Sequence, residues 1–133
     1  MIARWPGKIE PGTETNHVCA NWDFFPTALE IAGLPVSGGL DGISYLSTLT
    51  GKRQQAHDYL YWEYERRGKT HQAIRMGDWK GIRFGATESL ELYDLSGDSA
   101  ETANMASDQA DIVGKIEVLM ESARTESEFW ELL

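Results

Sequence analysis

The feature that most constrains this chain is a block of aromatic and alternating residues in its second half. Aromatic residues favour strands, and they dominate residues 59–64. Residues 72–76 and 79–84 alternate on either side of Gly77-Asp78, and two such runs joined by a two-residue turn containing Gly predict a hairpin. With a further run at 89–94, we expect three or four antiparallel strands.

One helical pattern follows this block and can cover the sheet. From residue 108 to 124, apolar residues recur at i, i+1, i+4, i+7 and i+8, which places them in one stripe on a helix. They are Ile112, Val113, Ile116, Leu119 and Met120. A small antiparallel sheet needs one face covered. We therefore predict an α+β fold in which the sheet packs on a C-terminal helix, with the apolar tail 127–133 docking on it.

The first half of the chain predicts one helix, a short strand and a long loop. Residues 23–32 predict a helix, because Pro26 suits a first helical turn and Gly33 lies where a left-handed C-cap belongs. A short strand is expected at residues 2–5. The stretch after the helix is rich in Gly and Pro, which predicts a loop and a domain boundary near residues 50–57.

Composition excludes several function classes. The 133 residues carry a net charge of −9, which argues against nucleic-acid binding and means that recognition of a sulfated anion would need a local basic pocket. No apolar stretch approaches the roughly 20 residues of a membrane helix. Residues 1–7 lack the apolar segment of a signal peptide. A single cysteine, Cys19, excludes an internal disulfide and any multi-cysteine metal site.

Motifs of a self-contained active site are absent. The chain has no phosphate-binding Gly loop, no HExxH and no CxxC, and we expect its three histidines to be structural, although a three-histidine metal site stays open. Three side chains near the aromatic strands, Glu63, His71 and Arg75, are candidate substrate-binding residues. A guanidinium such as Arg75 can bind an oxygen pair of a sulfate or a carboxylate. The alternative is a cross-strand ion pair between Glu63 and Arg75.

The order of short segments along the chain resembles the latter half of the sulfatase (arylsulfatase) family, from residue 3 to about 125. Each segment is weak alone, whereas their common order is specific. Ser99 and Met105 are mild departures, standing where the family usually has Pro and Leu. The matching segments are Arg4-Trp5-Pro6-Gly7-Lys8-Ile9, Pro11-Gly12-Thr13, Asp23-Phe24-Phe25-Pro26-Thr27, Ala32-Gly33-Leu34, Asp41-Gly42-Ile43-Ser44, Tyr59-Leu60-Tyr61-Trp62-Glu63, Ala73-Ile74-Arg75-Met76-Gly77-Asp78-Trp79-Lys80, Glu91-Leu92-Tyr93-Asp94-Leu95 and Glu101-Thr102-Ala103-Asn104-Met105-Ala106.

This resemblance implies an alkaline-phosphatase-like α/β fold for the whole enzyme. Residues 1–55 would be the tail of the catalytic domain, with its last strand and helix, and residues 56–133 the C-terminal subdomain. The family uses calcium and a formylglycine made from a Cys/Ser-x-Pro-x-Arg motif, which Cys19 followed by Ala20-Asn21 does not match. No catalytic or metal role therefore carries over to any residue here, and we expect no cofactor in this chain.

The expected function is the C-terminal segment of a sulfatase, a sulfuric ester hydrolase, which contributes scaffold and substrate-pocket residues but is not catalytic alone. Its partners would be the N-terminal catalytic domain and a sulfated small molecule or glycan. In the isolated chain, the strand at residues 2–5 would lack a neighbouring strand, and the helix at 23–32 would expose apolar surface. Both would drive self-association through this N-terminal arm. The alternatives are a stand-alone binding module on this scaffold and an unrelated small α+β hydrolase.

Overall fold

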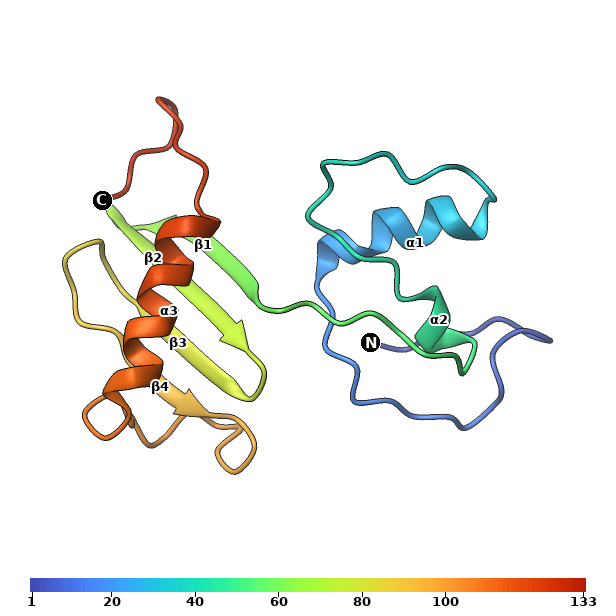
Figure 1. Ribbon diagram of the computed structural model, residues 1–133, viewed down its shortest axis with the longest axis horizontal. Helices are drawn as coiled ribbons and strands as arrows, with labels where there is room; N and C mark the ends of the chain where they lie inside the picture. Colours follow the sequence, from blue (N-terminus) through green and yellow to red (C-terminus); the bar gives the residue numbers. More distant parts are fainter. The chain divides into compact units, whose positions relative to one another are not determined.

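The computed structural model describes all residues from 1 to 133, and they divide into two compact units, residues 1–57 and residues 58–133 (Figure 1). The first unit holds a short 3-10 turn, Asn21–Asp23, which leads into helix α1, Phe24–Ile31, and later a single-turn helix α2, Leu46–Leu49. The helix predicted at 23–32 is thus present. No helix of the chain is long and apolar enough to span a bilayer.

The second unit is a four-stranded antiparallel sheet in the order β1-β2-β3-β4, followed by one helix. Its elements are β1 (Leu60–Arg66), β2 (Lys69–Met76), β3 (Trp79–Arg83), β4 (Glu91–Asp94) and α3 (Ala110–Ala123). The predicted α+β arrangement of a small antiparallel sheet and a C-terminal helix is confirmed.

Two tight turns set the register of this sheet. Met76 pairs with Trp79 across the predicted turn, where Gly77 adopts a φ of 60° that costs glycine little. Arg66 pairs with Lys69 across a second two-residue turn, in which both Arg67 and Gly68 have positive φ. Positive φ at both central positions belongs to the type I′ turn, whose twist matches that of paired strands.

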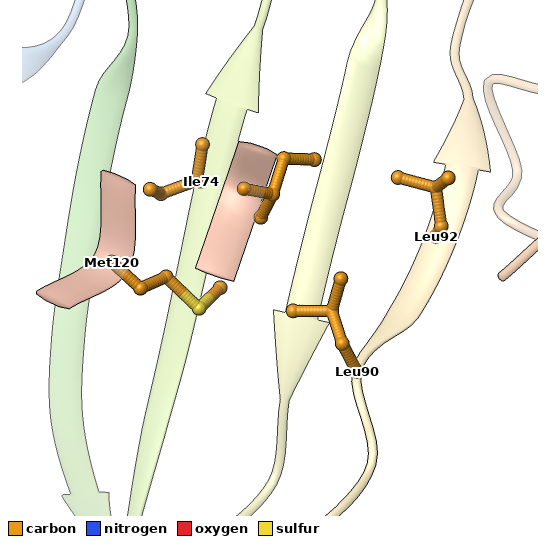
Figure 2. Close-up of a cluster of buried hydrophobic side chains, with 5 residues drawn as sticks. Ile74, Leu90, Leu92 and Met120 are labelled. Carbon is orange, nitrogen blue, oxygen red and sulfur yellow. The ribbon is translucent and has the colours of Figure 1, made fainter. Parts of the chain in front are cut away.

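The hydrophobic core lies between the sheet and α3. The buried cluster joins Ile74 from β2 and Leu92 from β4 to two residues of α3, Ile116 and Met120, and Leu90 closes one end (Figure 2). Ile74, Leu92, Ile116 and Met120 are all 0% exposed, so the apolar stripe predicted for the helix is the face that packs.

Gly81, in the middle of β3, allows α3 to approach the sheet closely. A Cβ atom placed on Gly81 would lie 2.7 Å from Cγ2 of Ile116 and 3.3 Å from Cδ2 of Leu90. The first distance is below van der Waals contact, so any side chain here would push the helix away from the strand. The absence of a side chain at Gly81 therefore sets the spacing between helix and sheet.

The strand predicted at residues 2–5 is not formed. A strand needs a neighbour to satisfy its main-chain N–H and C=O groups, and no strand of this chain belongs to residues 1–57. Helix α1 likewise leaves much apolar surface uncovered, with Phe24 65% and Phe25 56% exposed. Apolar side chains of α1 are thus left exposed, and residues 1–57 contain no strand.

Replacing Gly81 by Ala should lower the free energy of unfolding by about 1–3 kcal/mol, the usual effect of overpacking a core. Gly114, inside α3, is the matched control, because nothing lies within 4 Å of its missing Cβ and Ala there should stabilise the helix by about 0.5–1 kcal/mol. Urea denaturation of both variants measures the two effects. Equal shifts for Gly81→Ala and Gly114→Ala would rule out the close-approach explanation.

Candidate functional site

Strand alternation separates the three predicted site residues onto two faces of the sheet. Glu63 lies opposite Gln72 in the register, on the face that packs against α3. His71 and Arg75, at odd positions of β2, project from the other face. The three side chains therefore do not form a single site.

Glu63 is held in a dense hydrogen-bond network on the helix-facing side. Its carboxylate accepts hydrogen bonds from the Trp130 indole (2.6 Å), from Nε of Arg124 (3.2 Å), from the Gln72 amide (3.2 Å) and from the Tyr61 hydroxyl. Burial alone would raise the pKa of this carboxyl, but the hydrogen bonds from Tyr61 and Trp130 and the charge of Arg124 lower it. Glu63 is thus an ionised anchor that joins β1, the end of α3 and the C-terminal tail.

The same network extends to the neighbouring strands. The Gln72 side-chain oxygen accepts two hydrogen bonds from Arg83, at 3.0 and 2.5 Å. The Gln72 amide also donates to the Tyr61 hydroxyl at 2.7 Å. Burial and the bond to Glu63 raise the pKa of Tyr61 to about 12, so the phenol stays protonated and donates. Glu63 is therefore bonded directly to Arg124 and is connected to Arg83 through the neutral Gln72 side chain.

The cross-strand ion pair between Glu63 and Arg75 is not formed, and that alternative was wrong. Arg75 lies opposite Leu60, and its Nε donates to the carbonyl oxygen of Gly77 at 3.1 Å. The partner of Glu63 is Arg124, 61 residues away at the end of α3. No local pattern around either residue could have indicated this pairing, because it depends on how α3 docks.

The open face of the sheet carries an aromatic surface around His71. The imidazole lies between the rings of Tyr64 (centroids 5.0 Å apart) and Phe84 (5.2 Å, edge-on). Its Nδ1 atom is buried and has no hydrogen-bond partner. Tyr64 is 50% exposed, Phe84 41% and Trp62 36%. Buried polar atoms are nearly always paired, so this unpaired nitrogen is an exception among the polar groups of the chain.

Two hollows lie away from this sheet face, one in each unit. The larger of the two, about 1220 Å³, is bordered by residues between 1 and 16 and by residues 48–52. The smaller, about 260 Å³, is bordered by Glu65 and residues 128–133. Neither includes His71 or Arg75. The open sheet face therefore lines neither of these two hollows.

In the first unit, Asp23 is more than the helix-start carboxylate that its position suggests. It is 1% exposed, and its oxygens accept the main-chain N–H groups of Ala20 (2.7 Å) and Ile43 (2.9 Å). Nε2 of His57 lies 2.8 Å from the same carboxylate. His57 therefore has the structural, hydrogen-bonded role expected of it, and the cluster joins three separate segments of this unit.

Calcium and formylglycine do not fit the residues present. No group of three or more His, Cys, Asp or Glu side chains is arranged to hold a metal ion. Cys19 is a half-buried free thiol followed by Ala20-Asn21, not by the Pro and Arg of a formylglycine motif. No catalytic step is therefore derived for these residues.

Replacing Glu63 by Gln should lower the free energy of unfolding by about 1.5–3 kcal/mol at neutral pH, the usual size of hydrogen bonds to a charged group. Because its pKa is lowered on folding, this stabilisation is complete above the ordinary value of 4.5 and is lost as the pH falls below it. Denaturant unfolding from pH 3 to pH 7, with Glu117→Gln on the exposed side of α3 as control, measures the effect. A pH-independent difference between wild type and Glu63→Gln would contradict this role.

Comparison with known proteins places the chain in a family. The family described as N-sulphoglucosamine sulphohydrolase, C-terminal, matches residues 1–126. An N-acetylglucosamine-6-O-sulfatase of Bacteroides thetaiotaomicron is 32% identical over 142 residues, covering 100% of this chain and 24% of that protein. Human arylsulfatase K is 32% identical over 117 residues, covering 80% of this chain and 22% of that protein.

Two solved structures also match the fold of this chain. One, in complex with its substrate D-glucosamine-2-N,6-O-disulfate, has a TM-score of 0.76 at 27% identity and covers 90% of this chain and 26% of that chain. A 2-O GAG sulfatase has a TM-score of 0.68 at 26% identity, over 76% of this chain and 23% of that chain. The chain spans about a quarter of the length of these relatives. It belongs to the sulfatase family and corresponds to its C-terminal portion.

Proposed function

We propose that this chain is the C-terminal part of a sulfatase acting on sulfated carbohydrate, and that it supplies scaffold and one wall of the substrate site but no catalytic group. The observation that carries the proposal is the open aromatic face of the sheet with the unpaired Nδ1 of His71. The names of the relatives, which include an N-acetylglucosamine-6-O-sulfatase and an N-acetylgalactosamine-6-O-sulfatase, favour an amino-sugar sulfate ester.

The chemistry of this face suits such a ligand. Exposed aromatic rings offer flat apolar surface to the face of a sugar ring, and an imidazole nitrogen can bond a hydroxyl. Arg75 belongs to none of the ion pairs of this chain, so its guanidinium can bind a sulfate. With a net charge of −9, the molecule as a whole repels sulfate, and a local cation is required.

Glu63 would have an indirect role in this function. Since it faces α3 and binds Arg124 and Trp130, it would hold β1 in place rather than touch the substrate. His71 and Arg75 are then the two substrate-binding residues that we propose.

The reaction itself would take place on the upstream catalytic domain, with residues 1–55 as the end of that domain and 56–133 as the C-terminal subdomain. Calcium and formylglycine, which the family resemblance implies, would be held there. A stand-alone binding module is the alternative, and an intact upstream domain in the same reading frame separates the two.

In the full-length enzyme, His71→Ala should raise KM for a sulfated amino sugar by about 10-fold, the value of one hydrogen bond of about 1.4 kcal/mol. The kcat and the melting temperature should change little, because the imidazole lies on the open face and outside the core cluster. His17→Ala, in the N-terminal arm, is the matched control. Unchanged kinetics combined with a lower melting temperature would show that His71 is only structural.

We also propose that the isolated chain self-associates through its N-terminal unit. Ile2 is 99% exposed, Phe24 65% and Phe25 56%, and exposed apolar surface of this kind drives association. Light scattering over a concentration series should show oligomers, and replacing Phe24 and Phe25 by Ser should reduce them. A monomer at high concentration would contradict this proposal.

A further inference from the structure

The last seven residues of the chain fold back onto the second unit, and its end lies beside the start of β2 (Figure 1). Residues 127–130 make a tight turn in which the Trp130 N–H donates to the Ser127 carbonyl at 3.2 Å. The segment then runs to Leu133 without regular secondary structure. We call residues 127–133 the tail.

The end of the tail is held by main-chain donors that the sheet leaves unused. The last residue pair between β2 and β3 is Gln72 with Arg83, and beyond it the two strands separate. In the gap, the N–H groups of Thr70 (2.8 Å) and Ala86 (3.0 Å) both donate to the main-chain oxygen of Leu133. The Leu133 N–H donates in turn to the Thr70 hydroxyl at 2.8 Å. With the tail in place, Thr70 is 1% exposed, so the tail both pairs these donors and shields them from solvent.

The start of the tail is held by charged groups that are themselves buried. The Trp130 indole N–H donates to the Glu63 carboxylate at 2.6 Å, and Nη2 of Arg124 donates to the Trp130 carbonyl oxygen at 2.6 Å. The Glu63 side chain is 10% exposed and the Arg124 side chain 5%. We call these four residues, Glu63, Thr70, Ala86 and Arg124, the notch.

Apolar burial contributes little to this docking. Phe129 is 89% exposed, Leu133 49% and Trp130 43%. The tail is therefore attached mainly by hydrogen bonds, which is how extended peptides bind to sheet edges and main-chain donors. Segments with few buried apolar contacts also open locally without unfolding the rest of a domain.

We propose that the notch is a peptide-binding site and that the tail is its ligand, held in cis. The notch recognises an extended segment with an indole donor three residues ahead of a main-chain acceptor. Attachment to α3 gives the tail a high effective concentration, so the cis form predominates. The proposal does not depend on sulfatase activity, because Glu63 and Thr70 lie on the helix-facing side of the sheet, whereas His71 and Arg75 project from the opposite face.

Amide hydrogen exchange of the full chain tests this site. In Trp130→Ala, the amides of Thr70 and Ala86 should exchange about 10- to 100-fold faster, the effect of losing a hydrogen bond to a charged group. The amide of Ile74, in the middle of β2, should exchange at the wild-type rate. Phe129→Ala removes an aromatic ring of similar size that makes no such contact, and should leave all three amides unchanged.

Adding the peptide Ser127–Leu133 to the Trp130→Ala chain should restore protection of Thr70 and Ala86. The same peptide with Ala in place of Trp130 should not. Wild-type exchange at Thr70 and Ala86 in Trp130→Ala would overturn the proposal, as would no recovery with the added peptide. Faster exchange at Ile74 as well would overturn it too, because the tail would then be part of the core rather than a ligand.

Discussion

The close packing of α3 against the sheet at Gly81 is the constraint on which the second unit depends. Ile116 can reach the sheet only because β3 has no side chain at that position. That contact fixes which face of the sheet is buried, since strand alternation then commits every second residue of β1 and β2 to the helix side. The remaining residues of those strands project from the opposite face, which α3 does not cover.

The two faces consequently differ in chemistry. The helix-facing side is closed by the apolar cluster and by the network around Glu63, in which an ionised carboxylate is surrounded by donors from β1, β2, α3 and the tail. Such a network is costly to leave half-paired, so it specifies one position for the end of α3. The open side has aromatic rings, an imidazole with an unpaired nitrogen and a guanidinium outside any ion pair. We propose that the first face serves the structure of this unit and that the second serves substrate recognition.

The sequence predicted elements better than it predicted contacts. Strands and helices depend on patterns within a few residues, and the strands, α1 and α3 were found from them. The register of β1 and β2 was not predicted, because it depends on the two-residue turn at Arg67-Gly68, which makes 63 pair with 72 and separates Glu63 from Arg75. Recognising that turn would have assigned the three candidate residues to two faces. The pairing of Glu63 with Arg124 spans 61 residues and had no local signal, and the strand at 2–5 lacked a neighbour to pair with.

The central claim is that this part of a sulfatase shapes the enzyme but does not perform its reaction. The most direct measurement is hydrolysis of an aryl sulfate by the 133-residue chain alone, with and without added calcium, over days at high protein concentration. Our account predicts no release of sulfate above the buffer control in either condition. Reproducible, metal-dependent turnover that disappears when the chain is denatured would contradict it.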